Sequence, residues 1–202
     1  MDILFENRDI AVCIKPVGLD SEQELPEALK EQLGGEIFPL HRLDKNVAGV
    51  MVYARNKKAA AQLSAIIAKG EMVKEYVALV HGTPPENGDW EDFLFKDSGK
   101  NKVFVVKKER KGVKFARLEY QLLKSGEQSL VHIRLHTGRS HQIRVQFSSR
   151  GMPLVGERKY CTLEDPCEIA LWSYRLAFNH PYSGKPMEFS LEPPDIYPWS
   201  TC

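Results

Sequence analysis

The amino-acid sequence predicts a single α+β domain over residues 1–202, built on a largely antiparallel sheet with flanking helices and loops. Three observations support this prediction. The length suits one domain that buries a sizeable core without disulfides. Between Trp90 and His136, strand patterns follow one another without a helix. No repeat, low-complexity segment or convincing linker divides the chain, so one α+β domain is the economical interpretation.

Short apolar runs, many with β-branched or aromatic residues and bounded by turn residues, predict strands. They lie at residues 4–6, 10–14, 48–54, 73–82, 90–95, 102–107, 113–123, 129–136, 171–178 and 187–191. Helical spacing and end signals predict helices at 25–33, 57–69 and 141–150. Asn56 and Ser140 are the expected N-caps of the second and third helices, and a glycine follows the end of each helix.

The net charge of +1 conceals one strongly basic segment. Residues 1–40 carry 3 cations and 9 anions (net −6), residues 41–100 carry 9 and 8 (net +1), residues 101–160 carry 14 and 4 (net +10), and residues 161–202 carry 2 and 6 (net −4). Such a concentration predicts a polyanionic partner, with nucleic acid as the first choice and a solvated face without a partner as the alternative. The segment 107–112 is predicted at a hairpin tip, where its cations could grip a phosphate backbone.

Composition and the absence of certain motifs narrow the class of protein. The four cysteines include no CxxC pair and predict free thiols in a reducing compartment. The acidic start and the lack of a long apolar run predict a cytoplasmic protein without a membrane partner. No GxGxxG, GxxxxGK[ST], HExxH or GxSxG motif occurs, so no nucleotide cofactor is expected. The histidines His132, His136 and His141 have no acidic ligand nearby in sequence, so they favour a polar face over a metal site.

The segment His41–Gly49 presents Asp44 between two cations, Arg42 and Lys45, where a loop enters a predicted strand. Nearby cations favour the ionised carboxylate, which is the form of an anionic nucleophile or base. Taken alone, the pattern favours a surface ion pair, because residues two apart in an extended segment lie on the same face.

Three segments form an ordered set: His41-Arg42-Leu43-Asp44 followed by Gly49, then Lys74 to Gly82, and then His136-Thr137-Gly138-Arg139-Ser140-His141-Gln142-Ile143-Arg144-Val145-Gln146. Together they resemble the RluA family of RNA pseudouridine synthases. Their order and spacing are similar to those of the family, and both ends of the chain also match its pattern. The resemblance therefore covers nearly the whole chain and implies a pseudouridine synthase fold.

The resemblance implies specific roles. Asp44 corresponds to the family's catalytic aspartate, Tyr76 to the tyrosine that stacks on the target base, and Arg144 to the basic residue that pairs with the aspartate. Arg42 corresponds to an arginine that holds RNA open around the extruded nucleotide. Residues expected to contact RNA lie in the first motif, the basic segment and the third motif: His41, Arg42, Lys107, Lys108, Arg110, Lys111, Arg139, His141 and Gln142.

The implied reaction converts uridine to its C5-glycoside isomer in structured ribosomal or transfer RNA, and it requires no cofactor. Asp44 could attack C1′ or remove the 2′ proton, and the sequence leaves both routes open. One departure concerns Val47 and Ala48, which replace the Thr and Ser usual in the family. An alternative function is therefore a catalytically impaired RNA-binding protein that retains the synthase cleft. A histidine-metal hydrolase is a third hypothesis.

The chain begins almost directly with the catalytic-domain pattern, so no N-terminal S4 domain is expected. Target choice would then depend on the cleft, the basic segment and the shape of the RNA. A monomer is expected.

Overall fold

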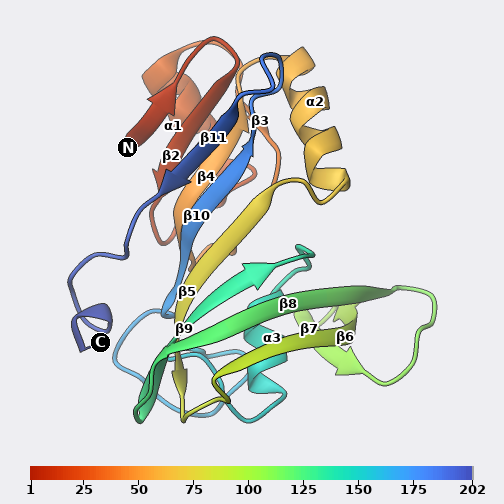
Figure 1. The fold of residues 1–202 in the computed structure, drawn as a ribbon, viewed down its shortest axis with the longest axis vertical. Helices are drawn as coiled ribbons and strands as arrows, with labels where there is room; N and C mark the ends of the chain where they lie inside the picture. The colour runs from red at the N-terminus through yellow and green to blue at the C-terminus, as the bar shows by residue number, and fades with distance from the viewer. Residues whose placement is uncertain (202) are drawn as a thin grey trace. The chain divides into compact units, whose positions relative to one another are not determined.

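The computed structural model describes residues 1–201, which divide into two compact units. The first unit comprises Met1–Lys74 and Trp172–Pro193, and the second comprises Glu75–Leu171 and Pro194–Cys202. Each unit combines strands with helices, so the predicted α+β class is confirmed (Figure 1). One catalytic domain over residues 1–202 stays a prediction.

The first unit holds a sheet in the order β1-β2-β4-β10, in which β3 also pairs with β4 and β11 with β10. Its strands are β1 (Ile3–Glu6), β2 (Ile10–Lys15), β3 (Phe38–Pro39), β4 (Ala48–Ala54), β10 (Leu171–Asn179) and β11 (Pro186–Ser190). The predicted hairpin of β1 and β2 is confirmed, and the Asn7 side chain closes its turn by accepting 2.8 Å hydrogen bonds from the N–H groups of Asp9 and Ile10. The pairing of β4 with β10 is parallel.

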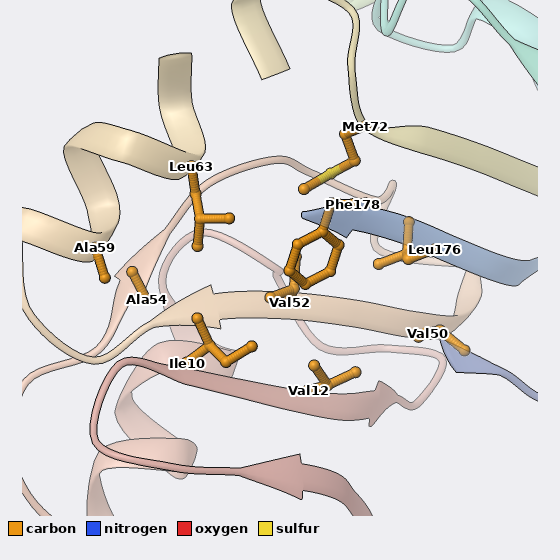
Figure 2. Packing of buried hydrophobic residues seen from close by; sticks show 10 residues of the cluster. All are labelled: Ile10, Val12, Val50, Val52, Ala54, Ala59, Leu63, Met72, Leu176 and Phe178. Atoms are coloured by element: carbon orange, nitrogen blue, oxygen red, sulfur yellow. The ribbon is translucent and has the colours of Figure 1, made fainter. Parts of the chain in front are cut away.

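Two helices, α1 (Glu24–Leu33) and α2 (Lys57–Ala68), belong to this unit. As predicted, Asn56 caps α2, because its Oδ1 accepts a 2.8 Å hydrogen bond from the Ala59 N–H. Figure 2 shows Ala59 and Leu63 of α2 directed towards β4, with Leu176 and Phe178 of β10 in the same cluster. This core joins segments from the two ends of the chain. Its ten buried members are Ile10, Val12, Val50, Val52, Ala54, Ala59, Leu63, Met72, Leu176 and Phe178.

The second unit holds an antiparallel sheet in the order β5-β9-β8-β6-β7. Its strands are β5 (Val73–His81), β6 (Asn87–Asp97), β7 (Lys102–Val106), β8 (Val113–Lys124) and β9 (Gln128–Leu135), followed by the helix α3 (Gln142–Ser148) and a 3₁₀ helix at Trp199–Thr201. Val145 of α3 packs against Leu94 and Ala116 of the sheet. Phe147 of α3 makes an edge-on contact with Trp90, with ring centroids 4.7 Å apart. These contacts fix the face of α3 that turns towards the sheet.

The prediction that residues 107–112 form a hairpin tip is wrong. Strands β7 and β8 both pair with β6, on its two sides, so the segment crosses β6 instead of turning between paired neighbours. The Arg110 guanidinium lies 5.2 Å from the centroid of the Phe95 ring on β6, which marks where the crossing lies. A single sequence shows where strands begin and end, but it carries no signal for which of three consecutive strands lies between the other two in the sheet.

The predicted start of the third helix is also wrong. The residue before α3 is His141, in the left-handed conformation with φ of 52°, and Ser140 is not the cap. The Gln142 side chain organises this turn, because its Oε1 accepts hydrogen bonds from the Thr137 hydroxyl (2.8 Å) and the Arg139 N–H (3.0 Å). The helix also ends at Ser148, two residues before the predicted end.

None of the helices within residues 1–201 combines the length and the apolar character that a membrane span requires.

Candidate active site

Asp44 lies in the first unit, on the loop that leads into β4, and it is half-buried. The loop is held on both sides of this carboxylate. The Ser21 hydroxyl donates to the Leu43 carbonyl (2.9 Å) and accepts from the Leu43 N–H (3.2 Å). The Asp44 carbonyl accepts a 2.9 Å hydrogen bond from the Val47 N–H. The backbone around Asp44 is therefore fixed before any substrate binds.

Lys15, the last residue of β2, is fully buried beneath this loop. Its ammonium donates to three carbonyl oxygens: Pro16 (2.9 Å), Lys45 (3.0 Å) and Val47 (2.7 Å). An ammonium has three N–H donors, so this geometry uses all of them. Burial lowers the pKa of Lys15 to about 8, and the charge of Asp44 opposes that shift. The sequence motifs did not identify this residue as part of the site.

His41 is held as a neutral base. Its Nε2 accepts a 3.2 Å hydrogen bond from the Val52 N–H, which places the ring proton on Nδ1. Burial, together with the charge of Lys74, lowers the pKa of His41 to about 3. The imidazole therefore joins the loop to β4 and carries no charge at neutral pH.

The two cations that flank Asp44 in sequence form ion pairs with other carboxylates. Arg42 Nη1 lies 3.3 Å from Glu22, and Lys45 Nζ lies 3.1 Å from Glu24. All four side chains are about half exposed, so these pairs contribute little to stability. Arg42 remains accessible at the surface of the first unit.

The apolar pair Val47-Ala48 is buried, with exposed fractions of 2% and 7%. Gly49 follows with φ of +121°, and a Cβ there would lie 2.4 Å from the Ser173 carbonyl oxygen of β10. The glycine is required because β10 approaches β4 closely at this point. Lys15 binds the Val47 carbonyl directly, so the loop has a polar anchor without side-chain hydroxyls at 47 and 48.

Tyr76 and Arg144 lie in the second unit. Tyr76 is buried in β5, where it pairs with Ile133 of β9. Arg144 projects from α3 and forms a bidentate ion pair with Glu157, with Nε–Oε2 at 2.6 Å and Nη2–Oε1 at 2.8 Å. Such paired bonds fix the plane of a guanidinium.

Glu157 is a fully buried carboxylate that the sequence motifs did not identify. Burial alone would raise its pKa, but the Arg144 hydrogen bond and charge and the N–H groups of Lys159 and Tyr160 outweigh that effect. Its pKa is therefore lowered, and the group is ionised at neutral pH. The ion pair with Arg144 supplies the opposite charge that a buried carboxylate requires.

Tyr160 completes this cluster. Its ring lies 5.7 Å from the Arg144 guanidinium, its oxygen accepts a 2.9 Å hydrogen bond from the Val103 N–H, and the same hydroxyl lies 2.6 Å from His141 Nδ1. The structure thus brings together two predicted site residues, His141 and Arg144. Tyr160 itself follows no recognisable pattern in the sequence.

The other predicted RNA-contacting residues differ in exposure. The side chains of Lys107, Lys108, Arg110 and Lys111 are all exposed. Arg139 is half-buried, and its Nε donates a 2.8 Å hydrogen bond to the Phe115 carbonyl. Gln142 is only 3% exposed, and its Nε2 donates to the Arg117 carbonyl at 3.1 Å.

Comparison with known proteins identifies the family. Residues 9–149 match the family described as RNA pseudouridylate synthase. The chain belongs to this family. It is therefore an isomerase that converts uridine to pseudouridine. The match includes all three segments that carry the resemblance to RluA-type synthases.

Individual relatives extend the likeness over nearly the whole chain. An uncharacterized RNA pseudouridine synthase of Aquifex aeolicus is 34% identical, over 98% of this chain and 72% of the relative. Ribosomal large subunit pseudouridine synthase D of Zymomonas mobilis is 29% identical, over 96% and 69%. The tRNA pseudouridine synthase C of Vibrio vulnificus is 27% identical, over 91% and 86%. The structure of human RNA Pseudouridylate Synthase Domain Containing 1 shares the fold, with a TM-score of 0.83 and 22% identity over 96% of this chain and 84% of the human chain.

The two other histidines of the cluster that the sequence singled out lie beside carboxylates in this pseudouridine synthase. His132 Nε2 lies 3.3 Å from Glu75, and His136 Nε2 lies 3.0 Å from Glu119. Within residues 1–201, no group of three or more His, Cys, Asp or Glu side chains is arranged to hold a metal ion.

Proposed function

We propose that the enzyme isomerises uridines in structured ribosomal or transfer RNA, with Asp44 as the reacting carboxylate. The names of two relatives, one acting on ribosomal RNA and one on tRNA, support this range of substrates. In this proposal Tyr76 stacks on the target base and Arg144 pairs with Asp44. Because the base must leave its helix or loop to react, the RNA binds with the target nucleotide flipped out.

The fixed backbone around Asp44 is the observation that carries the assignment. Ser21 and Lys15 hold the residues on both sides of Asp44 through buried hydrogen bonds. An enzyme gains rate when its reacting group is oriented before the substrate arrives. A carboxylate in a surface ion pair would not need a buried ammonium beneath its loop.

The reaction leaves the elemental composition of the substrate unchanged. The N1–C1′ bond breaks, the uracil rotates, C1′ joins C5, and the C5 proton moves to solvent while N1 is protonated. Asp44 acts either by attack on C1′ or by removal of the 2′ proton, and both routes require it to be ionised. Glu157 and Tyr160 hold the Arg144 guanidinium in one orientation, which supports its role beside an anionic group.

RNA contact is assigned to cations of the motifs and of segment 107–111, and the polar residues His41 and Gln142 are assigned to holding the loops. Arg42, Arg139 and the four cations of segment 107–111 contact phosphates. His41 and Gln142 are engaged by backbone groups of their own unit, so they position the Asp44 loop and the turn before α3. His141 contacts the Tyr160 hydroxyl, and the Tyr160 ring lies beside the Arg144 guanidinium. His141 is therefore assigned to holding Tyr160 in place next to Arg144.

The experiment is an isomerisation assay that uses tritium release from RNA labelled at C5 of uridine. We expect Asp44→Asn to abolish release while its RNA Kd stays within about threefold of the wild-type value, because the change removes one charge and preserves shape. The control is Asp2→Asn, which neutralises an exposed carboxylate of the same unit. Wild-type turnover in Asp44→Asn would refute the mechanism. RNA binding without turnover in the wild type would instead support the impaired RNA-binding protein.

A further inference from the structure

One face of the sheet in the second unit carries four phenylalanines. Phe93 pairs across the ladder with Phe115, and Phe95 pairs with Phe104. Directly paired residues in an antiparallel sheet point to the same side, and so do residues two apart on one strand. All four rings therefore lie on one face of β6, β7 and β8. We name these four residues the Phe platform.

The opposite face of the same strands is covered. Leu94, Val103 and Ala116 point to that side and are buried against Val145 of α3. On the platform side, Phe104 is 37% exposed and Phe115 is 40% exposed. Phe115 makes an edge-on contact with Phe93, with ring centroids 6.3 Å apart, so these two rings form one apolar surface. An exposed aromatic surface of this kind is typical of a binding site.

The charge around the platform is positive. The basic segment 107–112 crosses this face, because Arg110 stacks on the Phe95 ring at 5.2 Å. Arg139 binds the Phe115 carbonyl and so places a second guanidinium at the platform. The acidic residues Asp89 and Glu91 lie further along β6, where Arg117 binds them. Two acidic residues lie nearer the platform: Glu109 within segment 107–112, and Asp97, which pairs with Lys102 next to Phe95. Cations outnumber acidic residues around the platform, so its surroundings are positive overall.

We propose that the Phe platform binds an unpaired segment of the RNA substrate, with bases stacked on Phe104 and Phe115 and phosphates held by the basic segment. Single-stranded RNA is the polyanion with flat apolar faces, and aromatic rings beside cations on a sheet are how proteins recognise it. A duplex presents phosphates but keeps its bases stacked on one another. The platform thus makes the enzyme select RNA with unpaired bases near the target uridine, an inference that rests on the proposed RNA substrate.

The test compares the full-length protein on two probes: a single-stranded RNA of about 12 nucleotides and a duplex of the same sequence. Phe104→Ala with Phe115→Ala should raise the Kd for the single strand at least about tenfold and leave duplex binding unchanged. The slope of log K against log salt should not change, since no cation is lost. Phe104→Tyr with Phe115→Tyr should bind like the wild type, because it keeps the rings.

Two further variants sharpen the result. Replacement of Lys107, Lys108, Arg110 and Lys111 by Gln should flatten the salt slope for the single strand by about 3, at about 0.7 for each cation. Leu123→Ala is the matched control, since Leu123 is an exposed apolar residue of β8 outside the platform. Phe104→Leu with Phe115→Leu keeps apolar volume without rings, so this variant should bind as weakly as the Ala variant. Because its side chains stay large and apolar, it also serves as a control for a folding defect.

The proposal is overturned by unchanged single-strand affinity in the Ala variant, by an equal loss on the duplex, or by an equal loss in Leu123→Ala. It is also overturned if sedimentation shows a wild-type dimer that the Ala variant abolishes, since a second copy would then cover the platform. If the Phe variants bind normally and Asp44→Asn is inactive, the platform fails and the catalytic assignment stands. If the Phe variants bind weakly and Asp44→Asn is active, the platform stands and the catalytic assignment fails.

Discussion

The His41 imidazole shows how a single residue can fix the loop that carries Asp44. It accepts a hydrogen bond from the Val52 N–H, and a protonated ring could not do so. Its pKa falls from 6.5 to about 3 on folding. The unfolded chain therefore binds a proton below pH 6.5 that the folded chain does not bind until the pH approaches 3.

This difference predicts a loss of stability in acid. Because the unfolded state binds more protons in that window, the free energy of unfolding should fall as the pH drops below 6.5, by up to about 1.4 kcal/mol per pH unit. His41→Gln keeps an acceptor for Val52 and cannot be protonated, so its stability should change less between neutral pH and about pH 5. Urea unfolding over that range measures both proteins. Parallel pH profiles would show that His41 does not titrate as described.

Residues differ in how visible their roles are in the sequence. Asp44, Tyr76 and Arg144 belong to motifs whose order and spacing are specific. Glu157 lies in a loop outside those motifs, and Lys15 stands at the end of an otherwise apolar strand. A charged residue on its own predicts exposure. Only the fold shows that each is buried with a full set of hydrogen-bonding partners.

At the scale of elements, the pairing of β4 with β10 depends on Gly49. An added Cβ would lie 2.4 Å from the Ser173 carbonyl oxygen and 2.6 Å from the Ser173 nitrogen. Both are backbone atoms, so they cannot move away by a side-chain rotation. The φ of +121° adds strain for any other residue. The end of the Asp44 loop is thus tied to the position of β10.

We expect Gly49→Ala to lower the free energy of unfolding by about 3–5 kcal/mol, from backbone strain and overpacking together. Isomerisation should fall with it. The control is Gly18→Ala, because Gly18 also has a positive φ (+92°) but has no atom within 4 Å of the added Cβ. That variant should lose about 1 kcal/mol, from strain alone. Urea unfolding would contradict the close-approach argument if the two variants lost equal stability.

The elements themselves were largely predictable. All the predicted strands and helices form, with bounds shifted by a few residues, because apolar runs and turn residues report local structure directly. The two-residue strand β3 is too short to leave a pattern. The crossing of segment 107–112 over β6 depends on which strand lies between two others, and local sequence does not encode that order.

At the scale of the whole molecule, each unit is assembled from stretches far apart in sequence. The core of the first unit takes Ile10 and Val12 from the start of the chain and Leu176 and Phe178 from near its end (Figure 2). The apolar character of both stretches predicts that they are buried. Their meeting in one core cannot be inferred from a single chain, because no local signal links residues more than 150 positions apart.

Phe178→Ala tests this long-range dependence. The ring is 4% exposed and packs within the cluster that contains Val12 and Val52, so its removal should leave a cavity and cost about 3–5 kcal/mol of unfolding free energy. Hydrogen exchange should show faster exchange at the amides of β2 and β4, although the substitution lies more than 120 residues away in sequence. Leu191→Ala, at an exposed residue of the same C-terminal segment, should leave those amides protected. Unchanged exchange in β2 and β4 of Phe178→Ala would mean that the N-terminal strands hold their structure without the C-terminal segment.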